Sequence, residues 1–334
     1  MRFLIIGAGS MGTRRVRNLL ELGYTDIIIY DIDSDSSIKT AAKHGVEYVR
    51  ELSELWNNKP NMAIISIPPL TKQLYIDFCN QLNIPCFCEA DICTYSGTYT
   101  ASATMRFHPA IQKIKELLDN GTLGKIYTFT FHHGMHLRDW HPGADYKKYY
   151  AAKKETGAGQ EMLCFELSWL SYLFGIPVDI RGFVDKKLND AGISADDVFA
   201  TTVKFGQSII SLRRFPFAIN NTVYKNTITG TFLNDVVSRP AIRELRIIGE
   251  KCNLLWDWNT DYIELEQPDG EISMIFYSKG KAAESYNSNI CEQMYVDELS
   301  AWIDSIQNGT PYPYSKEEEE AVIKMLKKVE EENG

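Results

Sequence analysis

The feature that most constrains the fold is a glycine-rich turn close to the N-terminus. An apolar run at 3–6 leads into GAGSMG at 7–12, and a helical pattern of apolar residues follows. A second apolar run, 27–30, ends at Asp31, which lies 19 residues after Gly12. A strand, a glycine turn, a helix, a strand and an acidic residue in this order are typical of a dinucleotide-binding βαβ unit.

The residues of this unit predict the cofactor. Gly7 permits the tight turn, Gly9 leaves room for a pyrophosphate, and Gly12 lets the helix pack closely on the strand. Free N–H groups at the helix N-terminus can then bind the phosphates. Asp31 can accept hydrogen bonds from the ribose hydroxyls and would repel a 2′-phosphate, so we expect NAD rather than NADP.

Strand and helix patterns alternate through the first 106 residues and predict a parallel, doubly wound sheet. Ligands bind such sheets beyond the carboxyl ends of the strands. Asp33 is the alternative to Asp31 for the ribose, and Arg14 and Arg15 are close enough along the chain to reach a phosphate. The residues that we expect to contact the cofactor are Gly7, Gly9, Ser10, Met11, Gly12, Asp31, Ser66, Pro68 and Glu89.

The pattern changes from about Gly124 onward. Segments with the alternation of β-strands run from 125 to 277 and are interrupted by one long helical stretch at 160–174. This order predicts an α+β domain built on a large, mostly antiparallel sheet. We expect a first domain at 1–106 and a second at 107–334, whose C-terminal helix could return to the first.

Composition narrows the class of partner. The 334 residues suffice for two domains, and the net charge of −9 argues against nucleic acid or an anionic membrane surface. No apolar run approaches the ~20 residues of a membrane span, and we see no signal peptide. Several of the seven cysteines have apolar neighbours, which suits reduced thiols and a cytoplasmic location. Cys86, Cys88 and Cys93 lack paired CxxC spacing, so we expect no metal site.

Over nearly its whole length the chain resembles the glucose–fructose oxidoreductase and inositol dehydrogenase (Gfo/Idh/MocA) family. The markers are GAGSMG, ISIPP at 65–69, CEAD at 88–91, the junction MRFHPAIQKIKELLDNGTLGKI at 105–126, and TGAGQEMLCFELSWLSYLFG at 156–175. The resemblance implies an α/β Rossmann domain, an α+β domain with an open-faced sheet, and NAD(P) use. It also implies hydride exchange with a sugar-like alcohol, and a homodimer or homotetramer formed through the sheet face.

The departures from the family concern its acid/base residues. The lysine of the family's Glu-Lys-Pro motif aligns with Ala90, and its proline aligns with Asp91. Its later Asp and His fall near Met162 and Phe165, where this chain offers Glu161 and Glu166 instead. The segment 89–106 is short and rich in threonine, so we expect the crossover helix there to be truncated or absent.

Polar and aromatic side chains concentrate at 132–150, after the first strand of the second domain. Such a mixture suits sugar binding, since aromatic rings cover C–H surfaces and polar groups bind hydroxyls. We take His141 and Lys147 as the leading candidates for base or acid, with Tyr146 as an orienting residue or relay. Glu161 and Glu166 are the alternatives. Neighbouring strand residues face opposite sides, so at most one of His132 and His133 faces a site.

The sequence thus predicts an NAD-dependent oxidoreductase acting on a sugar, amino sugar or nucleotide-linked sugar. Two alternatives remain. One is an NAD-binding sensor or scaffold protein that has lost catalysis. The absence of a lysine at position 90, which is Ala90 here, favours this alternative, and the polar segment 132–150 disfavours it. The other is a lyase that retains its NAD and produces no net NADH.

Overall fold

The computed structural model describes residues 1–140, 145–190, 192–208, 224–280 and 290–333. The chain divides into two compact units, the first formed by Met1–Phe107 with Cys291–Glu319 and the second by His108–Ile290 with Glu320–Gly334. The boundary expected after residue 106 lies one residue from the first division. The segment 291–319, which we expected in the second domain, groups with the first unit instead.

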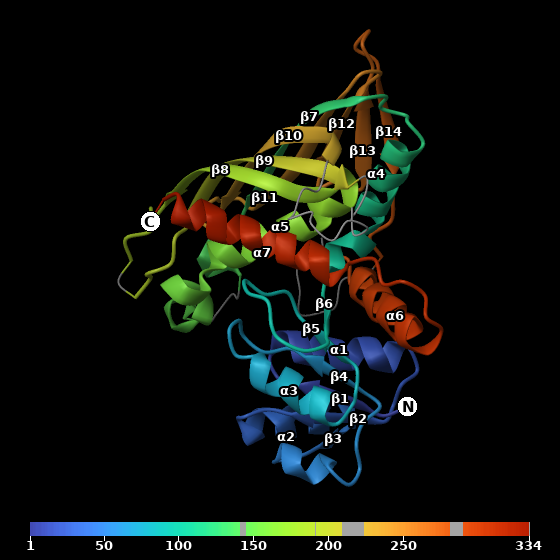
Figure 1. Ribbon diagram of the computed structural model, residues 1–334, viewed down its shortest axis with the longest axis vertical. Helices are drawn as coiled ribbons and strands as arrows, with labels where there is room; N and C mark the ends of the chain where they lie inside the picture. Colours follow the sequence, from blue (N-terminus) through green and yellow to red (C-terminus); the bar gives the residue numbers. More distant parts are fainter. Residues whose placement is uncertain (141–144, 191, 209–223, 281–289, 334) are drawn as a thin grey trace, which may run out of the picture. The chain divides into compact units, whose positions relative to one another are not determined.

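The first unit is built on a six-stranded parallel sheet of order β3-β2-β1-β4-β5-β6 (Figure 1). Its strands are β1 (Phe3–Ile6), β2 (Ile27–Tyr30), β3 (Glu47–Tyr48), β4 (Met62–Ile65), β5 (Cys86–Cys88) and β6 (Thr100–Ala101). Strands β1, β4 and β5 are buried throughout, which explains their continuous apolar runs. The strand order reverses between β1 and β4, the position where α/β sheets bind ligands.

Helices cover both faces of this sheet. They are α1 (Ser10–Glu21), α2 (Ser34–His44), α3 (Gln73–Gln81) and α6 (Gln293–Gln307), with short 3₁₀ turns η1 (Leu52–Leu55) and η2 (Thr104–Phe107). Leu299, Trp302 and Ile303 of α6 pack into the same apolar cluster as Val16 and Leu19 of α1. Between β5 and β6 the chain forms a loop and no helix, in agreement with the poor helix formers in this segment.

The second unit is built on an eight-stranded sheet of order β14-β13-β12-β11-β7-β10-β9-β8. Its strands are β7 (Ile126–Gly134), β8 (Ile176–Asp185), β9 (Val198–Ser208), β10 (Tyr224–Asp235), β11 (Ile242–Gly249), β12 (Asn253–Asp257), β13 (Tyr262–Glu266) and β14 (Ile272–Phe276). All neighbours pair antiparallel except β7 and β10, which are parallel. The two sheets confirm the expected fold class. The strand that we expected at 208–215 falls largely outside the described residues.

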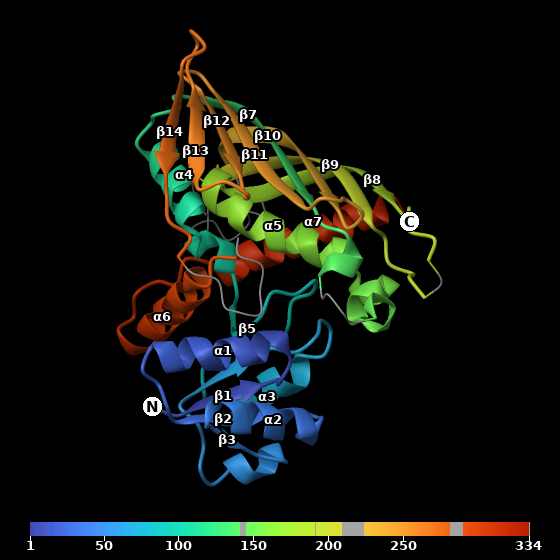
Figure 2. The same ribbon diagram turned by 180° about the vertical axis from the view of Figure 1, so that it is seen from behind.

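Helices lie along one face of the eight-stranded sheet (Figures 1 and 2). They are α4 (Pro109–Asp119), α5 (Ala158–Phe174) and the part of α7 (Lys316–Glu331) that belongs to this unit, and the short turns η3 (Leu137–Asp139), η4 (Tyr146–Lys148), η5 (Tyr150–Ala152) and η6 (Lys154–Thr156) precede α5. Phe129 and Phe131 of β7 are buried beneath this layer, whereas Tyr127 is 54% exposed. No helix in the described parts of the chain is long and apolar enough to cross a membrane.

Candidate active site

The turn after β1 contains two glycines that the fold cannot replace with a larger residue and one, Gly9, beside which there is free space. Gly7 has φ +104°, and a Cβ there would lie 2.3 Å from the carbonyl oxygen of Ser66. A Cβ on Gly12 would lie 1.7 Å from the carbonyl oxygen of Gly7. A Cβ on Gly9 would meet nothing within 4 Å. Gly9 therefore borders free space at the N-terminus of α1, which fits a pyrophosphate.

Asp31, the first residue after β2, is held against this turn. Its Oδ2 accepts a hydrogen bond of 2.6 Å from the Ala8 amide, and its Oδ1 accepts one of 2.9 Å from the Asp33 amide. The carboxylate of Asp33 instead caps α2 and accepts hydrogen bonds from the Asp35 amide and the Ser36 hydroxyl. Because its carboxylate is used by the helix, Asp33 is the weaker of the two ribose candidates.

The remaining cofactor candidates of the first unit follow β4, which pairs with β1, and β5, which pairs with β4. The Ser66 hydroxyl donates a hydrogen bond of 3.1 Å to Glu89. Pro68 is exposed in the loop after β4, and its carbonyl oxygen accepts a hydrogen bond from Thr71. The structure thus brings the residues expected at the cofactor to one edge of the sheet, where the strands end.

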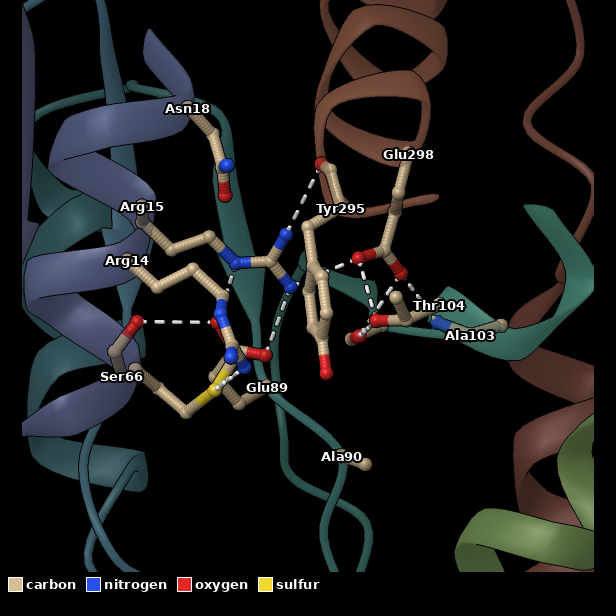
Figure 3. Close-up of polar contacts among 12 residues, drawn as sticks. Arg14, Arg15, Asn18, Ser66, Glu89, Ala90, Ala103, Thr104, Tyr295 and Glu298 are labelled. Atoms are coloured by element: carbon tan, nitrogen blue, oxygen red, sulfur yellow. Dashed lines mark hydrogen bonds and ion pairs between the residues drawn. The ribbon is translucent and has the colours of Figure 1, made fainter. Parts of the chain in front are cut away.

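Glu89 is engaged by a buried arginine that sequence reasoning had assigned elsewhere. The Arg15 guanidinium forms a bidentate pair with Glu89, with distances of 2.7 and 2.9 Å, and a third contact of 2.8 Å with Glu298 (Figure 3). Burial alone would raise the pKa of Glu89, but Arg15 holds it below its ordinary value. Arg15 is fully buried, so it organises the strand ends and is not free to bind a phosphate.

Arg14 is likewise engaged. Its guanidinium lies 3.3 Å from Glu292 and 4.2 Å from the ring centre of Tyr295, both in the segment 291–319. The idea that Arg14 and Arg15 reach a phosphate is therefore replaced by one in which they hold α6 against α1. The partners Glu292, Tyr295 and Glu298 lie more than 270 positions further along the chain, too far for a local sequence pattern to reveal the contact.

Glu298 is a functional partner that the sequence analysis missed. It is fully buried on α6 and binds Arg15. Met294, Glu298 and Trp302 are spaced four residues apart, so Glu298 interrupts an apolar stripe of the helix. This charged residue within an apolar stripe was the one sequence signal of its role. Its two oxygens accept further hydrogen bonds from Ser102, Ala103, Thr104 and Tyr312.

A lysine does contact the turn that contains Ala90, but it comes from another position. Lys72, at the start of α3, is fully buried. Its Nζ donates hydrogen bonds of 2.6 Å to the carbonyl oxygen of Glu89 and 3.1 Å to that of Ala90, and lies 2.9 Å from Asp91. Lysine is rarely buried without a partner, and Asp91 is that partner here.

In the second unit, the acid/base candidates at 132–150 differ in their surroundings: one is hydrogen-bonded, one is exposed, and one lies outside the described residues. The Tyr146 hydroxyl donates a hydrogen bond to Asp190, which also binds Arg138 at 2.8 Å. Lys147 is exposed, with its side chain available to solvent. His141 lies outside the described residues. The aromatic side chains form an apolar cluster around a small pocket lined by Leu137, Trp140, Tyr146, Tyr149, Tyr150 and Ala151.

The two glutamates of α5 differ in how they are bound. Glu161, in the first turn, accepts a hydrogen bond of 3.3 Å from the Tyr150 hydroxyl. Glu166 is fully buried, with one oxygen 2.6 Å from an Arg243 nitrogen and the other accepting a 2.6 Å hydrogen bond from the Trp169 indole. Because both of its oxygens are occupied, Glu166 is better suited to support another group than to accept a substrate proton.

The adjacent histidines of β7 face opposite sides of the sheet. His132 lies 2.8 Å from Asp235, whose pKa is lowered to about 2 by this contact and by amide hydrogen bonds, in spite of its burial. His133 is 5% exposed and lies 3.0 Å from Asn234 and 3.9 Å from Glu166. Among the described residues, no group of three or more His, Cys, Asp or Glu side chains is placed to hold a metal ion.

Comparisons with known proteins agree with this geometry. Residues 1–104 match the family model described as an oxidoreductase family with an NAD-binding Rossmann fold, and residues 111–215 match that of the GFO/IDH/MocA C-terminal domain. Together they cover more than half of the chain. A search of curated proteins finds no match.

Solved structures show the same fold at low identity. An oxidoreductase from Agrobacterium radiobacter in complex with NAD+, L-tartaric acid and magnesium has 12% identity and a TM-score of 0.78, over 99% of this chain and 95% of that one. Levoglucosan dehydrogenase in complex with NADH has 12% identity and a TM-score of 0.78, over 100% and 98%. UDP-N-acetylglucosamine 3-dehydrogenase from Acidithiobacillus ferrooxidans has 13% identity and a TM-score of 0.72, over 100% and 97%.

The open space at Gly9, the placement of Asp31 and the two family matches lead to one conclusion. The chain belongs to the Gfo/Idh/MocA family of oxidoreductases, and its Rossmann domain binds NAD.

Proposed function

We propose that this protein is an NAD-dependent dehydrogenase that oxidises an alcohol carbon of a sugar, amino sugar or nucleotide-linked sugar. The observation that carries the proposal is the state of the glycine turn. The surrounding backbone leaves no room for a side chain at Gly7 and Gly12, whereas a side chain at Gly9 would enter free space. Asp31 accepts a hydrogen bond from the Ala8 amide of the same turn. A turn that had lost its cofactor role would have no physical need to keep a glycine at the open position.

Two features support the substrate class. Levoglucosan dehydrogenase and UDP-N-acetylglucosamine 3-dehydrogenase, which share this fold, are by name enzymes of sugar-derived alcohols. In the second unit, the segment before α5 combines four aromatic side chains with charged groups, namely Trp140, Tyr146, Tyr149, Tyr150, Arg138 and Lys147. Aromatic faces with nearby charged groups are the usual means of binding a polyol.

The chemistry requires a hydride acceptor and a base for the hydroxyl proton. NAD+ supplies the first. For the second, the candidates are Lys147, His141, Glu161 and the polar group around His133. The hydrogen bond from the Tyr146 hydroxyl to Asp190 supports the role of an orienting residue for Tyr146.

The proposal is tested by incubating the purified protein with NAD+ and a panel of alcohols, and following NADH absorbance together with product formation. The panel contains levoglucosan, myo-inositol, UDP-N-acetylglucosamine and L-tartrate. NADH formed in proportion to product supports a dehydrogenase. Product without net NADH identifies the lyase alternative, and NAD binding with neither product nor NADH across a wider sugar panel identifies the sensor.

A further inference from the structure

Polar side chains form a row across three neighbouring strands of the second unit, beneath α5. Strand β7 lies between β10 and β11, and His133 has Asn234 and Arg243 as its register partners on them. Side chains at matched positions of neighbouring strands point to the same face of a sheet. Glu166 of α5 completes the group, with Oε1 2.6 Å from an Arg243 nitrogen and 3.9 Å from His133 Nε2.

Hydrogen bonds determine which ring nitrogen of His133 carries the proton. The side-chain nitrogen of Asn234 donates a 2.8 Å hydrogen bond to the carbonyl oxygen of Gly159, which can only accept. The side-chain oxygen of Asn234 is therefore the atom that lies 3.0 Å from His133 Nδ1, and Nδ1 must donate to it. In a neutral imidazole, Nε2 then holds a lone pair. Within the described part of the chain, Nε2 forms no hydrogen bond.

The surroundings of His133 suit a group that gains a proton briefly. Burial lowers its pKa, and Arg243 acts in the same direction, whereas Glu166, Asn234 and Asp235 oppose them. The ring is therefore neutral near pH 7 and able to accept a proton. Once protonated, it carries a positive charge 3.9 Å from the Glu166 carboxylate, in a setting where little water screens the attraction.

We propose that His133 is the general base of the reaction and that its Nε2 accepts the substrate hydroxyl proton. The inference rests on the dehydrogenase function proposed above. The carbinol carbon gives a hydride to NAD+, the C–O single bond becomes C=O, and the hydroxyl proton passes to Nε2, which leaves an imidazolium and NADH. Asn234 is a positioning residue that selects the tautomer, and Glu166 and Arg243 stabilise and orient the ring.

The kinetic test uses whichever panel alcohol gives NADH with the wild-type protein. His133→Gln is expected to lower kcat by about 100-fold or more, the scale of a general base, and to remove the fall in kcat at low pH. NAD affinity should stay within about twofold, since the substitution leaves the glycine turn and Asp31 unchanged, and imidazole added to His133→Ala should restore part of kcat. His132→Gln, one position away on the opposite face, is the matched control and should retain nearly full kcat.

A second measurement needs no substrate. In ¹⁵N-histidine NMR of the NAD-bound protein at pH 7, His133 should show a protonated Nδ1 and a bare Nε2, and Asn234→Leu should mix the two tautomers. A protonated Nε2 in the wild type would overturn the assignment, as would full activity in His133→Gln with a 100-fold loss in Lys147→Ala or His141→Ala. Absence of turnover with every alcohol counts against the proposed function, while the NMR result still judges His133.

Discussion

Gly9 and Gly12 lie in the same turn, yet a side chain at each would meet different surroundings. A Cβ at Gly12 would overlap the carbonyl oxygen of Gly7 at 1.7 Å, whereas one at Gly9 would enter open space. We expect Gly9→Val to keep its Tm within about 5 °C of the wild type but to weaken NAD binding by at least about tenfold, because the side chain occupies the pyrophosphate position. Gly12→Ala should lower Tm clearly. Thermal unfolding and fluorescence titration with NAD measure both, and tight NAD binding by Gly9→Val would contradict the cofactor site.

A second residue-scale prediction concerns the choice of cofactor. Asp31 is held at the turn by Ala8, and we expect the wild type to bind NAD more tightly than NADP because the carboxylate repels a 2′-phosphate. Asp31→Asn keeps an oxygen for the Ala8 amide and removes the charge, so it should reduce the preference by about tenfold. Asp33→Asn, which alters only the cap of α2, is the control and should keep it. Equal affinity of the wild type for both cofactors, from parallel titrations, would remove Asp31 from this role.

At the scale of elements, the loop between β5 and β6 contains a buried polar network. Asp91 binds Lys72 and accepts a 2.7 Å hydrogen bond from the Tyr95 hydroxyl, and Tyr99 donates one of 2.8 Å to Glu319. Glu319 also feels the charges of the Lys72 ammonium and the Asp91 carboxylate, which act on it in opposite directions. Burial raises the pKa of Glu319 to about 7, in spite of the hydrogen bond from Tyr99.

This raised pKa predicts how stability depends on pH. Between pH 4.5 and 7, folded Glu319 holds a proton that the unfolded chain releases, so its contribution to stability falls as the pH rises through this window and is lost above it. Glu319→Gln is neutral at every pH. It should match the wild type near pH 4.5 and exceed it by about 3 kcal/mol at pH 8. Urea unfolding at both pH values measures the difference in the free energy of unfolding. If Glu319→Gln changes this free energy equally at pH 4.5 and pH 8, Glu319 does not titrate in this range.

Helix α6 provides the other element-scale test. Glu298 is fully buried between Arg15 and the 102–104 segment. Glu298→Gln removes the negative charge that faces Arg15, and leaving a buried charge without its partner costs about 3 kcal/mol. We expect a loss of that size in urea unfolding. Glu116→Gln, which breaks an exposed pair with Lys113, is the control and should change little. A small effect of Glu298→Gln would show that Glu89 alone satisfies Arg15.

The same elements show what the sequence could and could not predict. The βαβ unit was predictable because its signals are local. The place of helix α6 in the first unit was not, because it depends on contacts such as that of Arg15 with Glu298. The burial of Lys72 had no signal at all, since lysine is usually exposed.

The candidate base was hidden for a related reason. His133 could be assigned to a strand, and the alternation of faces separated it from His132. Its partners Asn234 and Arg243 lie about 100 residues away on other strands, and the pairing register that brings them together cannot be derived from one sequence. The sequence therefore directed attention to His141, Tyr146 and Lys147, and to Glu161 and Glu166, rather than to His133.

At the scale of the whole molecule, the eight-stranded sheet has one face without helices in the described part of the chain (Figures 1 and 2). Large apolar side chains are exposed at both edges of this sheet, with Phe183 on β8 at 75%, and Met274 and Phe276 on β14 at 50% and 72%. Exposed apolar patches of this kind mark protein contacts. The family resemblance also implied association through the sheet face.

We therefore predict a homodimer or homotetramer in which this sheet face meets another copy of the chain. Self-association would remove the exposed apolar side chains from water and match each patch with its own copy, as closed symmetry requires. The double variant Met274→Lys with Phe276→Lys places two charges in the contact and should dissociate the oligomer, whereas Tyr48→Lys, an exposed aromatic of the first unit, should leave it intact. Light scattering at micromolar concentration measures the mass. A wild type that remains at the monomer mass of 38.1 kDa would rule out the prediction, and an oligomer that survives the double variant would place the contact elsewhere.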